Sequence, residues 1–295
     1  MEHPLQMDYG PIPGWAILAI IGAVSVSFFS YQVWKATRLV MIGKADNRFD
    51  NWPTRIKEVA TGWLGQKKVL EDKVAGGIHV LMFWGFLMLS TDMFDLATAN
   101  WFSHSFLPAF VKGPWNLMVE TGYTIALLGC VAALTRRVVF TPEKLKGKSQ
   151  LEGNIILILI MTITVTSFFV EAGEAGVSST FEPIGAWVAD TIAPSTAVVV
   201  GAYWAHMLAI ATFMFLIPLS KHMHLVMALP NVFFHDMRPM ATMEPMQVDE
   251  SGKAVLLDDL DVESFGTANY TDLTWRSLID CLLYTSDAAD DDHCV

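Results

Sequence analysis

The sequence predicts an all-α membrane protein, a bundle of five transmembrane helices with the N-terminus outside and the C-terminus inside. Three observations lead to this prediction. Of the 295 residues, 53% are hydrophobic and 17% are charged, whereas about 25% of the residues in an ordinary soluble domain are charged. The hydrophobic residues gather in five separate blocks, and the Lys and Arg residues concentrate in alternate segments between those blocks.

Each hydrophobic block is a candidate membrane span. A helix needs about 20 apolar residues to cross the hydrocarbon core. The first, second, third and fifth blocks meet this requirement directly, and Leu151 and Ala172 extend the fourth. The predicted spans are residues 15–34, 76–97, 117–134, 155–170 and 196–219.

The distribution of basic residues gives the predicted orientation. Cytoplasmic loops of membrane proteins are enriched in Lys and Arg. Every Lys and Arg except Lys112 lies between the first and second blocks, between the third and fourth, or after the fifth. Residues 44–73 also place Trp52, Ile56 and Val59 at helical spacing. They predict a helix that either lies at the inner membrane surface or packs on the protein's own inner face.

The net charge and the cysteines exclude some classes of site. The formal net charge of -11 arises largely from the acidic segment between Asp249 and Asp292, so it describes the tail more than the membrane region. We expect no nucleic-acid partner.

Cys130, Cys281 and Cys294 form no CxxC motif, so this chain alone predicts neither a zinc ribbon nor an iron–sulfur cluster.

The last residues differ in character from the rest. Residues 281–292 read CLLYTSDAADDD and resemble the translation of a transposase adapter used in sequencing libraries. We therefore interpret residues 281–295 as adapter read-through, which is excluded from fold reasoning. The alternative is a natural, acidic and disordered tail.

Four histidines lie in or beside the predicted spans, where ionisable groups are costly and usually functional. His79 is near the inner end of the second span, and His206 is in the outer half of the fifth. His222 and His224 follow at the inner end. On a continuous helix, His206 and His224 would share one face about 27 Å apart, although Pro218 would bend that helix. Each histidine could instead be a hydrogen-bonded residue between helices.

The depths of these histidines select a pair. His79 and His224 are expected at one depth on facing helices, as the two imidazole ligands of a haem b require. His222 is the reserve ligand. His206 could bind a second haem, but the outer half of the second span has no histidine. His104, in an outer loop, is a further candidate for that position.

Three stretches of the chain carry a family resemblance. They resemble the membrane region of heterodisulfide-reductase-related iron–sulfur reductases, which is similar to the nitrate reductase gamma subunit, a five-helix cytochrome b. The resemblance covers roughly residues 13–280. It implies that His79, His206 and His224 are haem ligands, and it leaves the second haem in doubt because Leu89 occupies the outer ligand position. The stretches are GQKKVLEDKVAGGIHVLMFWGFLML, HMLAIATFMFLIPLSKHMHLVMALPNVFF and VESFGTANYTDLTWRSLID.

The resemblance also implies a division of the chain and a function. Residues 1–235 would be the haem-b membrane domain, and residues 236–280 a cytoplasmic linker leading to an iron–sulfur domain with 4Fe–4S clusters outside this sequence. The full protein would be an oxidoreductase of the cell membrane that passes electrons between quinone and this iron–sulfur module, with an electron-transfer flavoprotein as a candidate partner. The present chain would lack the catalytic iron–sulfur domain.

Quinol oxidation needs a proton acceptor, and the acidic residues near the outer ends of the helices are candidates. They could equally be solvated helix ends. The quinone-site candidates are Asp92, Glu120 and Glu171, with Asp95 and Glu174 nearby.

Two other functions remain open from the sequence. One is a metal transporter that uses His222, His224 and His235. The other is a cofactor-free membrane anchor for soluble redox partners.

Overall fold

The computed structural model describes residues 3–93, 107–140, 148–174, 177–237 and 269–287. Within these ranges, five helices are long and apolar enough to cross a membrane, which confirms the predicted all-α class and the five spans. In chain order the elements are β1 (Asp8–Tyr9), β2 (Ile12–Pro13), α1 (Gly14–Val40), α2 (Trp52–Glu58), η1 (Val59–Leu64), η2 (Val69–Glu71), α3 (Lys73–Ser90), α5 (Ala109–Val139), α6 (Lys148–Gly173), α7 (Pro183–Thr191), α8 (Thr196–Leu216), η4 (Ile217–Leu219), η5 (Lys221–Met223), α9 (His224–Phe233), η7 (Tyr270–Asp272) and α10 (Trp275–Asp287).

The helices begin and end at different residues from the hydrophobic blocks. Helices α1 and α5 are longer than predicted, because polar residues that flank an apolar block also continue its helix. Helix α3 begins at Lys73, since the Asp72 side chain accepts hydrogen bonds from the backbone of Val74 and Ala75 at 3.1 and 3.0 Å and so caps its N-terminus. The predicted end of this span, residues 94–97, and His104 lie outside the described residues.

The fifth span does not continue as one helix to His224. Helix α8 ends at Leu216, and Ser220 is extended, with φ -128° and ψ 174°. Proline lacks the N–H that an α-helix needs, so Pro218 favours the stop. The Ser220 hydroxyl then accepts a hydrogen bond from the His222 N–H at 3.2 Å and starts the next turn. The prediction that His206 and His224 share one face of a continuous helix is therefore wrong.

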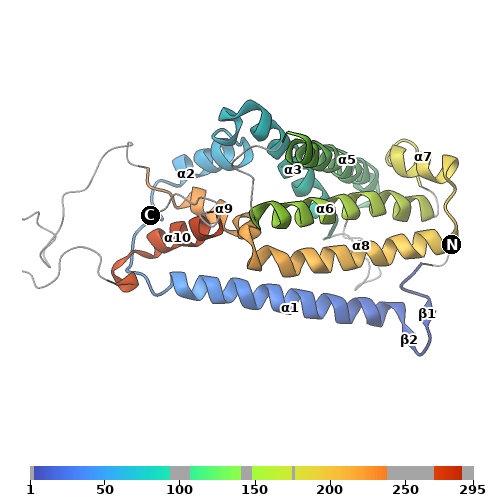
Figure 1. Ribbon diagram of the computed structural model, residues 1–295, viewed down its shortest axis with the longest axis horizontal. Coiled ribbons are helices and arrows are strands. Elements are labelled where there is room, and N and C mark those ends of the chain that lie inside the picture. The colour runs from blue at the N-terminus through green and yellow to red at the C-terminus, as the bar shows by residue number, and fades with distance from the viewer. Residues whose placement is uncertain (1–2, 94–106, 141–147, 175–176, 238–268, 288–295) are drawn as a thin grey trace, which may run out of the picture.

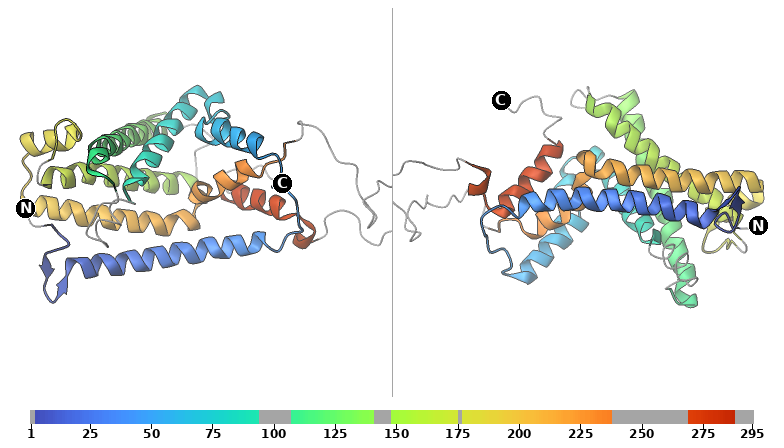
Figure 2. Two further views of the ribbon diagram at one scale, coloured as in Figure 1. Left: turned by 180° about the vertical axis from the view of Figure 1, so that it is seen from behind. Right: turned by 90° about the horizontal axis from the view of Figure 1, so that it is seen from below.

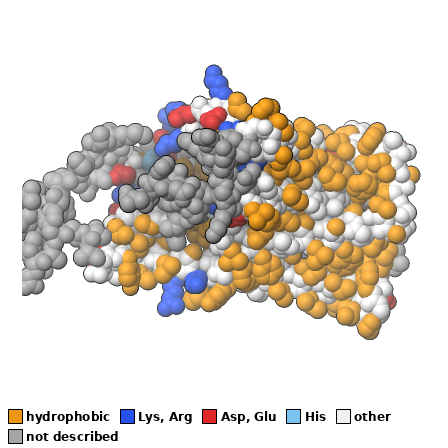
Figure 3. Space-filling view, in the orientation of Figure 1, with side chains coloured by type: hydrophobic (Ala, Val, Ile, Leu, Met, Phe, Trp, Pro, Cys, Tyr) orange, Lys and Arg blue, Asp and Glu red, His pale blue; other side chains and the backbone are white. Residues whose placement is uncertain are grey.

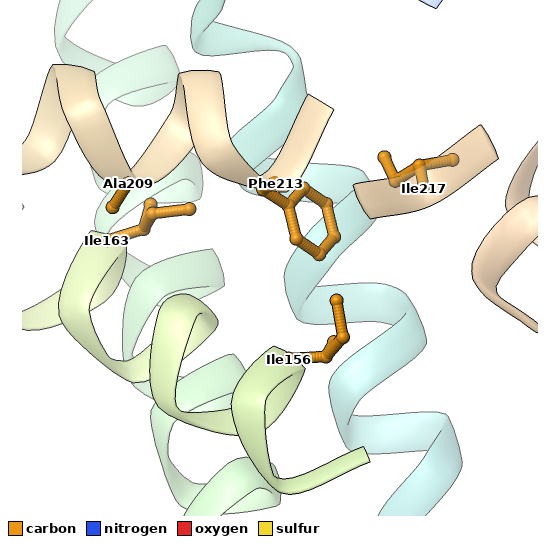
Figure 4. Packing of buried hydrophobic residues seen from close by; sticks show 5 residues of the cluster. All are labelled: Ile156, Ile163, Ala209, Phe213 and Ile217. Carbon is orange, nitrogen blue, oxygen red and sulfur yellow. The ribbon is translucent and has the colours of Figure 1, made fainter. Parts of the chain in front are cut away.

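The long helices pack in a chain of neighbours. Helix α3 packs on α5, α5 on α6, α6 on α8, and α8 on α1, and the two views of Figure 2 both show α1 and α8 side by side. A hydrophobic cluster joins the α6–α8 side of the bundle (Figure 4). Its buried residues are Ile156, Ile163, Ala209, Phe213 and Ile217.

The bundle has two distinct ends. Strands β1 and β2 and helix α7 lie at one end, whereas α2, α9 and α10 lie together at the other (Figure 1). Apolar side chains cover much of the face over the long helices in Figure 3, and Lys and Arg side chains appear nearer the α2 and α10 end. We call this second end the basic end.

The predicted helix in residues 44–73 exists as α2 and the π-helical turn η1. It packs on α9, where the rings of Trp52 and Phe233 have centroids 5.2 Å apart. Trp52 and Ile56 nevertheless remain 52% and 57% exposed. The helix thus packs on the protein itself and still presents apolar side chains outward.

Candidate functional site

The basic end brings His79 and His224 together from separate elements. His79 belongs to α3, and His224 is the first residue of α9. The two imidazoles are close enough for their charges to interact. The break after α8 therefore changes the path of the chain without separating the two histidines that the sequence paired.

The hydrogen bonding of His224 suits a ligand. Its Nδ1 lies 2.8 Å from the carbonyl oxygen of Lys221. An Nδ1–H group that donates to a backbone carbonyl leaves Nε2 available to a metal and fixes the orientation of the ring. The tautomer with the proton on Nδ1 is the one that this contact favours, because a carbonyl oxygen can only accept.

His79 has an unusual environment. Its Nδ1 is buried and has no hydrogen-bond partner in the described part of the chain. A buried polar atom without a partner costs about 1–3 kcal/mol, so such atoms usually indicate a missing ligand, water or function. Two imidazoles from separate helical elements, one of them with an unsatisfied nitrogen, are a donor set that fits the iron of a haem.

Helices α3 and α8, which lead to the two histidines, contact each other only loosely. Within the described residues these two helices are not among the closely packed pairs, and the rings of Phe86 and Phe213 bridge them with centroids 5.7 Å apart. A Cβ added to Gly77 of α3 would meet nothing within 4 Å. The same holds for Gly201, but that residue is exposed near the start of α8, at the α7 end of the bundle. A flat macrocycle requires such room.

Two other glycines near the predicted ligands have a different role. A Cβ on Gly76 would overlap the Val69 carbonyl, and a Cβ on Gly85 would lie 2.6 Å from the Ala126 nitrogen. These glycines serve the close packing of the protein on itself. The sequence did not distinguish them from Gly77 and Gly201.

His222 lies directly beside His224, with 5.9 Å between the ring centroids. Its Nδ1 is 3.0 Å from the Ser220 hydroxyl. Burial, followed by the charges of His224, Lys221 and Arg137, lowers the pKa of His222 to about 4. His222 is therefore neutral at pH 7, and it remains a candidate for the second ligand position.

The histidines of the proposed transporter do not form a metal cluster. His235 instead makes a contact of 2.7 Å between its Nδ1 and the Val232 carbonyl oxygen. Across the described ranges, no group of three or more His, Cys, Asp or Glu side chains could hold a metal ion.

His206 lies on α8 and is directed toward α6. It is 9% exposed, and its Nδ1 lies 3.0 Å from the Ile163 carbonyl oxygen. The hydroxyls of Thr166 and Ser167 are 3.1 and 3.3 Å from the same nitrogen. These contacts join α8 to α6, and they also leave Nε2 as the atom available to a ligand.

The opposite end of the bundle holds a buried carboxylate. Glu120 of α5 is 2% exposed, and its Oε1 accepts hydrogen bonds from the N–H groups of Ile184 and Gly185, both at 2.8 Å. These donors belong to the first turn of α7, where the helix dipole also favours a negative charge. Glu120 is therefore an internal cap of α7 and not a solvated helix end.

The other predicted acidic residues lie near Glu120. Glu171 of α6 lies against the same Gly185, because a Cβ added to Gly185 would be 2.9 Å from Glu171 Oε2. This oxygen is buried and has no hydrogen-bond partner in the described residues. Asp92 accepts a hydrogen bond of 3.3 Å from the Tyr123 hydroxyl.

Glu182 was not predicted from the sequence. It is 8% exposed and accepts hydrogen bonds from Asn116 Nδ2 at 2.8 Å and from the Ser178 N–H at 3.0 Å. Its position directly before Pro183, which is typical of the first residue of a helix, is the signal that could have identified it.

Comparison with known proteins adds two distant relatives. This chain is 26% identical over 305 residues to EtfAB:quinone oxidoreductase from Syntrophomonas wolfei, an alignment that covers 94% of this chain and 41% of that protein. It is 26% identical over 276 residues to the probable iron–sulfur-binding oxidoreductase FadF from Bacillus subtilis, with 90% and 37% covered. The chain thus spans about two fifths of the length of these curated relatives.

No family model matches the chain, and no solved structure matches it. The two relatives nevertheless show that this membrane region is related to quinone-linked iron–sulfur oxidoreductases.

Proposed function

We propose that this chain is the haem-b membrane domain of a quinone-linked oxidoreductase, which passes electrons between membrane quinone and an iron–sulfur module on the inner side. Two observations at the basic end carry the proposal: the charges of His79 on α3 and His224 on α9 interact, and the buried Nδ1 of His79 has no hydrogen-bond partner within the described residues. The resemblance of the sequence to the nitrate reductase gamma subunit points in the same direction.

The names of the relatives support the redox context and suggest partners. One is an EtfAB:quinone oxidoreductase and the other an iron–sulfur-binding oxidoreductase. We propose quinone and an electron-transfer flavoprotein as partners of the full protein. On this proposal residues 1–235 form the haem-b domain, residues 236–280 connect it to a domain with 4Fe–4S clusters, and residues 281–295 are adapter read-through.

Residues of the basic end would hold the haem either as ligands of the iron or by fixing the orientation of a ligand. His79 and His224 would ligate the iron, and the Lys221 carbonyl oxygen would fix the imidazole of His224 through its Nδ1–H. With both axial positions filled by imidazole, haem supplies one-electron transfer and does not activate oxygen. His222 would replace either ligand only as the reserve.

The proposed orientation in the membrane rests on the distribution of Lys and Arg residues along the sequence. We propose that the basic end faces the cytoplasm, because all Lys and Arg residues except Lys112 lie in the segments assigned to that side. The N-terminus and α7 would then face outward. A reporter that folds only outside the cell, fused to the C-terminus, should be inactive, and activity of that fusion would overturn this orientation.

The opposite end supplies the proposed proton acceptors for quinol. Glu171 has a buried and unsatisfied carboxylate oxygen, Glu120 is held by two backbone N–H groups, and Asp92 is held by Tyr123. We propose Glu171 as the first acceptor, since its Oε2 has no partner within the described residues. The variant Glu171→Gln should slow haem reduction by a quinol analogue, while dithionite should still reduce the haem fully.

A difference spectrum tests the function. The full chain, purified in detergent, should give a b-type α-band when the dithionite-reduced spectrum is compared with the oxidised one. His79→Ala and His224→Ala should each lose the same one haem per chain and its share of the band, whereas His235→Ala, a histidine at the same end, should keep the full band. A wild-type chain without the band, or a band that is undiminished in both His79→Ala and His224→Ala, would overturn the proposal.

The number of haems per chain, measured on the same purified protein, tests for an outer haem. If His206 holds a second haem, the wild-type chain should contain two haems and His206→Ala one. A single haem in both proteins would assign His206 to helix packing alone.

A further inference from the structure

The chain returns to the basic end after the five membrane helices. Helix α10 packs on α9, on η5 and on α1, and Figure 1 shows it between α1 and α9. The turn η5 leads directly into His224, the first residue of α9. Residues 269–280, which lie in the predicted linker, are therefore a structured part of the end that carries this histidine.

The first turn of α10 is joined to the segment that follows α1. The Lys44 N–H donates to the Leu273 carbonyl oxygen at 2.8 Å, and the Trp275 N–H donates to the Lys44 carbonyl oxygen at 3.1 Å. The Trp275 indole N–H also donates to the Asp46 carbonyl oxygen at 2.8 Å. A Cβ on Gly43 would lie 2.7 Å from Trp275 Cα, so this close approach of the two backbones requires a glycine.

A buried arginine joins α10 to the end of α9. Arg276 is 7% exposed, and its Nε and Nη2 groups donate to the carbonyl oxygens of Phe234 and Asn231 at 2.6 and 3.3 Å. Asp280 Oδ1 lies 2.7 Å from Arg276 Nη1 and accepts a hydrogen bond of 2.8 Å from Asn231 Nδ2. Satisfied polar networks make the packing around them rigid. The helix that begins at His224 is therefore fixed to α10.

This attachment determines where a longer chain would leave the membrane region. The chain spans about two fifths of the length of its two relatives, and all the contacts described above are made by residues before position 281. A module on a flexible linker of about 40 residues would lie about 35 Å from its point of attachment. A module that follows a docked α10 loses this freedom, and groups that must react gain from being held in one geometry.

We propose that residues 270–280 form a fixed arm that holds the iron–sulfur module of the full protein against the basic end, beside the proposed haem. Trp275 and Arg276 are the positioning residues of this arm. The inference rests on the proposed haem-b function, and it identifies the surface of α10, η5 and α9 as the place where the module attaches.

A fluorescent dye on Cys281, one residue past the arm, tests this proposal in the full chain. Cys281 is exposed and Cys130 is buried, so Cys294→Ser leaves Cys281 as the labelling site. Haem quenches a nearby dye by energy transfer, and the dye anisotropy reports docking of the arm with or without haem. We expect high anisotropy and strong quenching, and a fall in both in the double variant Trp275→Phe, Arg276→Gln, which loses the donors to Asp46 and Phe234.

The double variant should keep its b-type α-band, which shows that the membrane helices remain folded. Tyr270→Ala, at a 66% exposed residue of the same arm, is the matched control and should keep both dye signals. Equal signals in the double variant and the control would overturn the proposal, as would an unquenched dye in a haem-loaded chain. A fall in anisotropy with unchanged quenching would also overturn it. A chain that binds no haem would instead overturn the proposed function, and its anisotropy would still test the arm.

Discussion

The Arg55 Nη1 group donates a hydrogen bond of 2.8 Å to the Phe233 carbonyl oxygen and so joins α2 to the end of α9. The same guanidinium donates to the carbonyl oxygens of Asp50 and His235 at 2.9 and 3.1 Å. Its side chain is 1% exposed. A buried arginine that satisfies several carbonyls is a central connection of the basic end.

Removal of Arg55 should destabilise this end. Arg55→Leu removes this donor from the carbonyl oxygens, and we expect a loss of about 1–3 kcal/mol in the free energy of unfolding, as for buried hydrogen-bonding groups that are left without a partner. Thermal unfolding in detergent measures the change. Arg38→Leu, at an exposed position of α1, should leave the unfolding temperature nearly unchanged, and equal effects in the two variants would contradict the assignment.

The partner of Arg55 gives a prediction about pH. Asp50 Oδ1 accepts a hydrogen bond of 2.7 Å from Arg55 Nη2, and this hydrogen bond holds the pKa of Asp50 below its ordinary value of 3.8. A carboxyl group with a lowered folded-state pKa contributes stability above its unfolded pKa, and that contribution disappears as the pH falls through the folded-state pKa. Asp50→Asn should therefore lose less stability than wild type on acidification below about pH 4. Parallel acid-unfolding curves would contradict this prediction.

The five spans could be predicted because crossing a bilayer imposes a requirement on composition alone. About 20 consecutive apolar residues suffice to indicate a span, whatever the helix packs against. The end of α8 could not be placed in this way, because residues 196–219 contain no Lys, Arg, Asp or Glu that would mark it. Pro218 indicated a bend, but only the extended backbone at Ser220 and its capping hydroxyl show that a new helix begins.

The packing of α3 on α5 depends on glycines, which gives a third prediction. A Cβ on Gly122 would lie 2.7 Å from Met88 Cβ and 3.0 Å from the Leu89 nitrogen. Small residues allow membrane helices to approach closely, so Gly122→Leu should destabilise the bundle by about 1–3 kcal/mol, as for other overpacked sites. Gly22→Leu on α1, where a Cβ would meet nothing within 4 Å, is the matched control in the same unfolding measurement.

The candidate site was predictable in part. The sequence shows how deep each residue lies in the membrane, so His79 and His224 could be placed at one depth. In the structure the charges of the two side chains interact, and their pairing as haem ligands stays a prediction. The burial of Glu120 depends on the backbone of α7, which lies more than 60 residues further along the chain. Such contacts depend on how the helices pack, and residue spacing does not encode them.

His206 gives a fourth prediction, which concerns the bundle and not the haem proposed at His79 and His224. His206→Ala removes the contact with the Ile163 carbonyl oxygen and leaves a cavity, so the unfolding temperature should fall. The Ile163 carbonyl oxygen still accepts hydrogen bonds from Ser167 and Thr166, so the loss should be about 1 kcal/mol for the lost hydrogen bond, with the cavity in addition. The band assigned to His79 and His224 should remain, and its loss in His206→Ala would show that the two sites are not independent.

Ser220 gives the last prediction, because it determines where His224 begins its helix. Its side chain accepts a hydrogen bond from the His222 N–H at 3.2 Å, and loss of such a cap costs about 1 kcal/mol. In Ser220→Ala the turn at η5 should loosen, so the Lys221 carbonyl should hold the His224 imidazole less firmly. We expect less haem per chain and a broadened α-band, measured against Ser27→Ala at an exposed position of α1. Unchanged haem content in Ser220→Ala would mean that α9 holds His224 in place without this cap.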